Sequence, residues 1–261
     1  MGRLPQRLQH GEDATVVEHL EELRSRIIIV LGALALTTIV AFAFHGHILD
    51  WLNHPLPADR RRVVTLGVAE PFTVSVTVSV YAGFLLALPV ILWQFWSFFA
   101  PAFDPSNERS VLGLVAFASA LGTAGLAFGY LIVLPRALQW LTHYDASHFT
   151  TLIQAKAYYS FTSTVLLGIV LVFELPVIVL GLVSIGVLSS ATLRRNRRLG
   201  YFIVAVVALG LPGPDPVTTG LELLPMWALS EGSIWLAFFV ERARAGSLAA
   251  DRFDAVARQP D

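Results

Sequence analysis

The sequence predicts an all-α protein that crosses a membrane several times. Two properties of the whole chain point that way: 55% of its 261 residues are hydrophobic, and only 14% are charged. An average soluble protein has about 25% charged residues, so this chain lacks the polar side chains to cover a globule of its size. The third observation is a succession of six apolar stretches, each a candidate for a membrane-spanning helix of about 20 residues.

Composition and motifs also exclude several classes of function. The chain has no cysteine and a formal net charge of −1, which argue against disulfides or iron–sulfur clusters and against bulk attraction to nucleic acid. No phosphate-binding loop, zinc-protease motif or serine-hydrolase motif occurs. We therefore expect no enzyme, no metal and no other cofactor. For His45, His47 and His54, near one outer loop, metal binding is conceivable, but we favour solvated interfacial histidines.

The first four stretches are the strongest span candidates. They carry no formal charge except Glu174 in the fourth, next to Pro176, and Pro89 in the second predicts a tilt or kink. They cover residues 27–44, 72–99, 110–134 and 161–187.

The last two stretches are weaker. The fifth, residues 199–211, ends at a Pro-Gly-Pro-Asp-Pro run, and at 1.5 Å per residue it reaches only about 20 Å. The sixth, residues 221–240, includes Glu222 and Glu231. Each of these two stretches, taken alone, could be a re-entrant or buried helix. We interpret the pair as a hairpin of two short spans. The sequence thus predicts six transmembrane helices, with a short fifth and sixth.

The basic residues predict the orientation. Thirteen of the 18 lysines and arginines fall on the side of both termini, and an excess of basic residues marks the cytoplasmic side. The other five are Arg60, Arg61, Arg62, Arg136 and Lys156. The predicted parts are a cytoplasmic N-terminal segment with an amphipathic helix (1–26), a six-helix transmembrane domain (27–242) and a mobile cytoplasmic tail (243–261).

Three acidic residues are candidate functional groups. Glu22 either forms an ordinary helix pair with Arg26, four residues on, or belongs to an acidic surface for a basic ligand. Glu108 either caps the third predicted helix or accepts a guanidinium group. Glu174 lies near the middle of the bilayer, where a charge costs at least about 2.5–3.5 kcal/mol, so we expect it to have a functional role.

An ordered set of motifs resembles the TatC family of the twin-arginine protein translocase. His-Leu-Glu-Glu-Leu-Arg at 19–24 is followed by Pro55, by Glu-Pro-Phe at 70–72, and by Gln-Phe-Trp-Ser-Phe-Phe-Ala-Pro-Ala at 94–102 with Glu108 and Arg109. Phe-Gly-Tyr at 128–130, Phe-Glu-Leu-Pro at 173–176, Pro-Asp at 214–215 and Pro-Met at 225–226 with Glu231 complete the set. The matches cover roughly residues 16–242.

The resemblance implies a glove-like bundle of six helices in the cytoplasmic (inner) membrane, with both termini cytoplasmic. It implies a receptor for the twin-arginine signal peptides of folded proteins, which are exported with TatA- and TatB-like single-span partners using proton motive force. Self-association in a larger complex is also implied.

The resemblance also implies roles for individual residues. It places the arginine pair of the signal peptide at a cytoplasmic site made by Glu22, Glu108, Phe98 and Arg24. It implies intramembrane polar or partner-docking roles for Glu174, Glu231 and Gln94. It implies that Pro55 and Asp215 belong to functional periplasmic loops.

Other functions are consistent with parts of the sequence. A proton-coupled secondary transporter of small solutes would use Glu174, but we find no internal repeat of the kind that many transporters show. A membrane-embedded hydrolase lacks a recognisable nucleophile and base. A passive scaffold would bind its partners whether or not they carry an arginine pair.

Overall fold

The computed structural model describes residues 16–58, 62–99, 108–148, 152–210 and 215–257, and for 16–19, 99, 108–111 and 243–257 it describes the backbone alone. All regular elements within these ranges are helical, apart from one isolated bridge between Val64 and Gln154. The protein is therefore all-α in its described part, as the sequence predicts.

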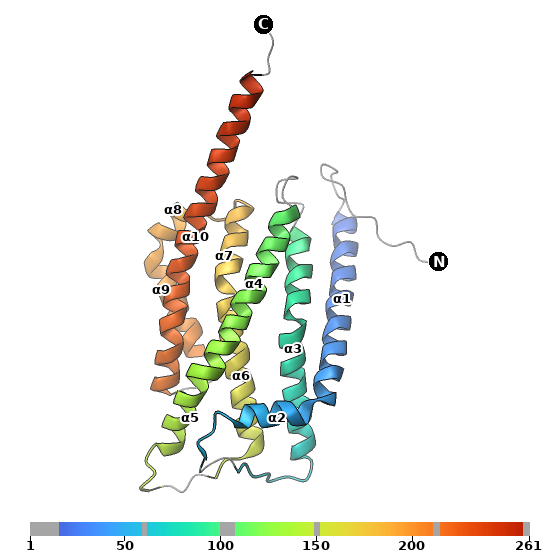
Figure 1. Cartoon of the computed structure of the whole chain (residues 1–261), viewed down its shortest axis with the longest axis vertical. Helices are drawn as coiled ribbons and strands as arrows, with labels where there is room; N and C mark the ends of the chain where they lie inside the picture. The colour runs from blue at the N-terminus through green and yellow to red at the C-terminus, as the bar shows by residue number, and fades with distance from the viewer. Residues whose placement is uncertain (1–15, 59–61, 100–107, 149–151, 211–214, 258–261) are drawn as a thin grey trace, which may run out of the picture.

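The long helices form an upright bundle (Figure 1). They are α1 (Val16–Ala43), α3 (Glu70–Phe99), α4 (Glu108–Phe128) with its continuation through the π-helical turn η4 (Gly129–Val133) into α5 (Leu134–His143), α6 (Ala155–Phe173) followed directly by α7 (Leu175–Ser184), and α10 (Pro216–Ala257). The short helices are α2 (His45–Asn53), α8 (Ser190–Arg195) and α9 (Arg197–Gly210).

Five of these segments are long and apolar enough to cross a membrane. They are Leu20–Ala43, Glu70–Phe98, Leu112–His143, Ala155–Ser184 and Pro216–Arg242. The fifth predicted span corresponds to α9, whose 14 residues extend about 21 Å at 1.5 Å per residue, less than the roughly 30 Å of a hydrocarbon core. The described structure thus supports five spans by length, and the count of six stays a prediction.

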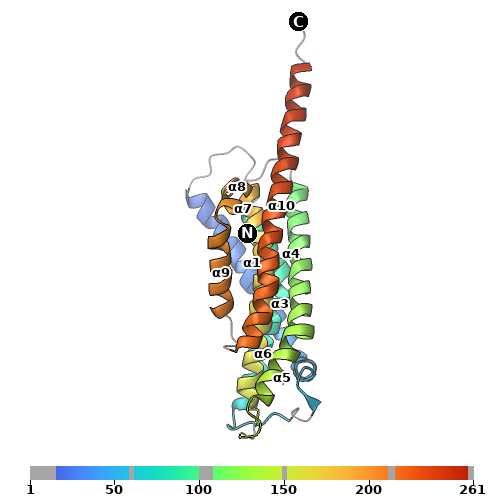
Figure 2. The same cartoon turned by 90° about the vertical axis from the view of Figure 1, so that its left-hand side faces the viewer.

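Helix α9 nevertheless reverses the direction of the chain. It runs antiparallel to α10, so the N-terminal end of α1 and the C-terminal end of α10 lie at the same end of the bundle (Figure 1). Figure 2 shows α10 between α9 and α4. The start of α1 and the end of α10 therefore lie on the same side of the membrane.

Helices continue across the predicted boundaries at residues 26 and 242. Residues from Val16 to Arg26 are the beginning of α1 itself rather than a separate surface helix, because no glycine or proline separates them from the apolar stretch. At the other end, the backbone of the tail continues α10 as far as Ala257. Whether that tail is mobile stays a prediction.

The core is centred on α6, which together with α7 forms the most deeply buried of the five spans. Its buried residues pack with residues of α2, α3, η4 and α5 in one cluster. Elsewhere in the bundle, glycines allow neighbouring helices to approach closely. On α3, Gly83 lies so close to α1 that an added Cβ would be 2.5 Å from the Thr38 hydroxyl. On α7, Gly181 lies directly against the ring of Trp96 from α3.

The loops at the lower end in Figure 1 are tied together by Glu70, the first residue of α3. Its carboxylate accepts backbone N–H bonds from Leu66 (2.8 Å), Gly67 (3.2 Å) and Lys156 (3.0 Å). Since Lys156 lies in the first turn of α6, one carboxylate caps that helix and fixes the loop that precedes α3.

Candidate functional site

Glu22 is bound to Arg26 of the same helix, at the end of the bundle where both described chain ends lie. The Arg26 guanidinium donates to Glu22 Oε1 from Nε at 3.0 Å and from Nη2 at 2.5 Å. The sequence left open whether Glu22 pairs with Arg26 or belongs to an acidic surface for a basic ligand. The structure contains the pair with Arg26. The second carboxylate oxygen of Glu22 is buried and accepts no hydrogen bond from the described residues.

Arg26 also connects α1 to the end of α3. Its guanidinium donates to the Ser97 carbonyl at 3.0 Å and to Gln94 Oε1 at 3.3 Å. We call Glu22, Arg26, Gln94 and Ser97 the Arg26 cluster. The side chains of Glu22 and Arg26 are 24% and 21% exposed, so the cluster is accessible to solvent. Gln94, which the resemblance associates with intramembrane or docking positions, thus lies beside Glu22 in this structure.

The other residues implied for the arginine site lie at the same end of the bundle. Phe98 is half-buried near the end of α3, and Arg24 is exposed on α1. Glu108 is the first residue of α4, but its side chain lies outside the described residues. The start of α1, the end of α3 and the start of α4 lie at the same end of the bundle (Figures 1 and 2), so the backbone places Glu108 at the same end as Glu22.

Glu174 is enclosed within the bundle. It lies at the break between α6 and α7, with Pro176 at the start of α7, and is 3% exposed. Its Oε1 would be 2.8 Å from a Cβ added to Gly122, so the carboxylate lies against the α4 backbone. Neither carboxylate oxygen has a hydrogen-bond partner among the described residues. The carboxylate is buried because Gly122 lets α4 come close.

Glu231 lies between α9 and α10. The Tyr201 hydroxyl donates to its Oε1, and Arg197 Nη2 lies 3.4 Å from its Oε2. The ring of Trp227 meets the Tyr201 ring edge to face. Glu231 therefore joins the short helix α9 to α10, and Glu174, Glu231 and Gln94 occupy three separate places.

The two loop residues also have defined positions. Asp215 is buried, and its Oδ1 accepts the backbone N–H groups of Val217 (3.1 Å) and Thr218 (2.8 Å). It is thus the N-cap of α10, a stabilising role that needs no ligand. Pro55 is half-buried in the turn after α2.

Sequence reasoning assigned no role to two buried acids. For Glu70 the available signal was its place before Pro71, since an acid followed by proline is typical of a helix start. For Glu222 the signal was an acid inside an apolar stretch, the same argument that singled out Glu174.

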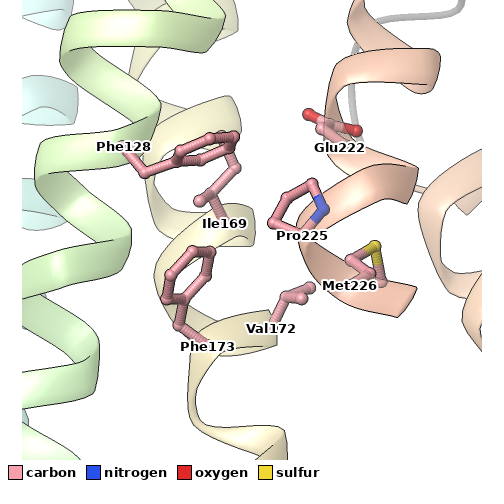
Figure 3. Close-up of a pocket in the computed structure, with 7 residues that line it drawn as sticks. All are labelled: Phe128, Ile169, Val172, Phe173, Glu222, Pro225 and Met226. Carbon is pink, nitrogen blue, oxygen red and sulfur yellow. The ribbon is translucent and has the colours of Figure 1, made fainter. Parts of the chain in front are cut away.

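Glu222 lines a small cavity between three helices. It is 2% exposed, and its Oε1 has no hydrogen-bond partner among the described residues. Figure 3 shows the cavity bounded by Phe128 of α4, by three side chains of α6 and by Pro225 and Met226 of α10. Its volume is about 10 Å³, close to the least that one water molecule needs. No cluster of three metal-ligating side chains occurs in the described ranges.

Comparisons with known proteins agree on one family. The family model for "Sec-independent protein translocase protein (TatC)" matches residues 18–225. The chain is 34% identical over 233 residues to the Sec-independent protein translocase protein TatCd of Bacillus subtilis, covering 89% of this chain and 95% of that protein. It is 33% identical over 228 residues to TatC of Carboxydothermus hydrogenoformans, covering 87% of this chain and 94% of that protein.

Solved structures give the same result for the fold. The crystal structure of the twin-arginine translocase receptor TatC is similar with a TM-score of 0.75 and 31% identity, over 85% of this chain and 98% of the other. The structure of that receptor in DDM has a TM-score of 0.76 at the same 31% identity, over 84% of this chain and 99% of the other.

Proposed function

The chain belongs to the TatC family of Sec-independent protein translocase proteins, and on that premise we propose that it is the receptor and core subunit that binds twin-arginine signal peptides. Family membership confirms the resemblance that the sequence motifs indicate. It makes the chain a transport protein and a component of the Tat translocase rather than a catalytic enzyme. Its five apolar helices make it a multi-pass membrane protein.

The proposed binding site is the end of the bundle that carries Glu22, Phe98, Arg24 and the first residue of α4, Glu108. The observation that supports it most directly is the accessible carboxylate of Glu22, which already holds one guanidinium, that of Arg26. The other oxygen of the same carboxylate, Oε2, accepts no hydrogen bond from a described residue, but it is buried, so a second guanidinium would reach it by displacing the side chains that cover it. Planar guanidinium groups can bind carboxylates through two parallel hydrogen bonds, which a lysine ammonium cannot do.

The test is binding of a twin-arginine signal peptide and its twin-lysine variant to the protein in nanodiscs. Removing one partner of a desolvated charge pair costs about 2–5 kcal/mol, so Glu22→Gln and Glu108→Gln should each weaken binding by roughly 30-fold or more. Glu21→Gln is the matched control, because Glu21 is exposed and carries the same charge. Equal affinity of both peptides, or unchanged affinity in both variants, would rule the site out.

The same proposal includes partner docking on α9. This helix packs on α8 and α10, and its outer face is apolar and exposed at Leu199, Phe202, Ile203, Val206 and Leu209. We expect the single helices of TatA- and TatB-like proteins to bind there, close to Glu231. A photo-crosslinker at Phe202 should capture such a partner in membranes, whereas one at Leu131, an equally exposed residue on η4, should not.

The remaining parts of the proposal follow the family. We place the chain in the cytoplasmic membrane with both termini in the cytoplasm, which agrees with the distribution of basic residues. Glu174 then supports signal insertion or helix docking from inside the bundle. Transport is driven by proton motive force, and several copies assemble in a larger complex. The alternative, a proton-coupled solute transporter, would require the purified chain alone to move a solute into liposomes.

A further inference from the structure

A second open cavity lies at the opposite end of the molecule from Glu22. It is formed where α5 and the first turns of α10 come together, near the lower end of the bundle in Figure 1. Its lining residues are Arg136, Gln139, Trp140, Val217 and Leu221. Its volume is about 270 Å³, many times the roughly 10–15 Å³ that one water molecule needs on the same measure.

The lining is polar on one helix and apolar on the other. Helix α5 contributes a guanidinium, an amide and an indole, whereas α10 contributes only Val217 and Leu221. A ligand that fits such a cavity has an anionic, hydrogen-bonding end and an apolar end. Glycerophospholipids combine these two ends in one molecule.

Arg136 supplies a cation that no described residue neutralises. Among the described residues it forms neither an ion pair nor a side-chain hydrogen bond. By contrast, Arg26 is bound to Glu22, and Arg197 lies against Glu231. An exposed guanidinium beside an exposed amide can bind a phosphodiester through charge-assisted, bidentate hydrogen bonds.

The depth of the cavity fits a headgroup. The span Leu112–His143 has 32 residues, whereas about 20 cross the hydrocarbon core. If the core begins at Leu112, the helix leaves it near Leu131, and Arg136 and Trp140 then lie at the level of the lipid headgroups. Tryptophan is enriched at this interface, where its indole ring contacts both water and hydrocarbon.

From these observations we infer that the cavity between α5 and α10 binds one anionic glycerophospholipid, with its phosphate on Arg136 and Gln139. Trp140 lies at the boundary between headgroup and chains, and the upper part of one acyl chain contacts Val217 and Leu221. The lipid then joins α5 to the start of α10. This inference does not depend on signal-peptide binding, because the cavity lies at the other end of the bundle.

Native mass spectrometry of the purified chain, titrated with phosphatidylglycerol or phosphatidylcholine, tests the inference. We expect one molecule of phosphatidylglycerol to bind to each chain, with a higher affinity than phosphatidylcholine. Arg136→Gln should weaken that binding about tenfold or more, since hydrogen bonds to charged groups contribute about 1.5–3 kcal/mol. Arg136→Lys keeps the positive charge, so it should lose less phosphatidylglycerol affinity than Arg136→Gln. Arg62→Gln is the matched control, because Arg62 is exposed in the loop at the same end of the bundle.

Two further arms complete the test. Gln139→Glu places a negative charge beside Arg136 at an exposed position, so it should weaken phosphatidylglycerol binding without affecting folding. Inorganic phosphate at millimolar concentration should not displace the lipid. Unchanged lipid affinity in folded Arg136→Gln and Gln139→Glu, equal binding of the two lipids, or full displacement by phosphate would each overturn the inference.

Discussion

The contact between Gly181 and Trp96 predicts a large effect from a single added methyl group. A Cβ at position 181 would lie 1.9 Å from Cη2 and 2.0 Å from Cζ3 of the Trp96 ring. Ordinary contacts begin at 3.4 Å, so the ring would have to retreat by about 1.5 Å. Trp96 is 3% exposed and packs with Val115, Ala118 and Val177, which leaves the ring little space to move into.

The expected loss of stability follows from two opposing effects. Overpacking of a well-filled core costs about 1–3 kcal/mol and occasionally more. Alanine is a better helix former than glycine by roughly 1 kcal/mol, which offsets part of that cost. Because an approach of 1.9 Å is severe, we take the upper end of that range, about 3 kcal/mol. For Gly181→Ala we therefore expect a net loss of about 2 kcal/mol, which lowers the melting temperature by roughly 4–8 °C at about 2–4 °C per kcal/mol.

The assay is thermal unfolding in detergent, followed by circular dichroism at 222 nm. Gly32→Ala is the matched control: Gly32 is also helical, but nothing lies within 4 Å of its added Cβ. That variant should be as stable as the parent or slightly more stable. In a Trp96→Phe background the smaller ring makes room, so Gly181→Ala should then cost much less. A Gly181→Ala protein as stable as the parent would refute the argument that α3 and α7 are in direct contact here.

Two further substitutions test the buried acids. Glu70→Gln should destabilise the protein by about 2–3 kcal/mol, because one oxygen that accepts backbone N–H bonds becomes a donor. Hydrogen exchange should then rise in residues 62–70 and 152–158; protection equal to that of an exposed-acid control, Glu21→Gln, would contradict the capping role. Glu222→Met should leave the melting temperature unchanged or raise it, because an apolar side chain replaces a carboxylate with an unpartnered oxygen in an apolar cavity. A clear loss of stability would mean instead that the carboxylate has a structural partner such as an enclosed water molecule.

Hydropathy predicted the spans well because bilayer thickness fixes how many apolar residues a helix needs. The end of the third span was harder to predict. Pro135 favours a helix end in the sequence, but the structure continues to His143. The π-helical turn before it allows this, since the Leu134 N–H bonds to the Gly129 carbonyl five residues back. Periodicity alone does not predict such a local change of hydrogen-bond register.

The site residues were predictable to the extent that a single helix determines them. The spacing of Glu22 and Arg26 allowed their pairing, which the structure contains. The part played by Gln94 depends on α1 and α3 meeting in space, 68 residues apart in the chain. Glu222 could have been singled out as an acid inside an apolar stretch, but the cavity that it lines depends on α4 and α6 meeting α10, which hydropathy along one helix does not show.

The packing of α6 has a consequence for how the protein is assembled. Helix α1 packs mainly against α3, so these two helices can form a hairpin as soon as the first hundred residues have been made. Helix α6 has neighbours on both sides of it in the chain, since it packs against α3 and α4, which precede it, and against α10, which follows. Until α10 is synthesised, the face with Ile169, Val172 and Phe173 lacks its cover. Docking of α10 is therefore the step that closes the bundle and takes Glu222 out of contact with lipid.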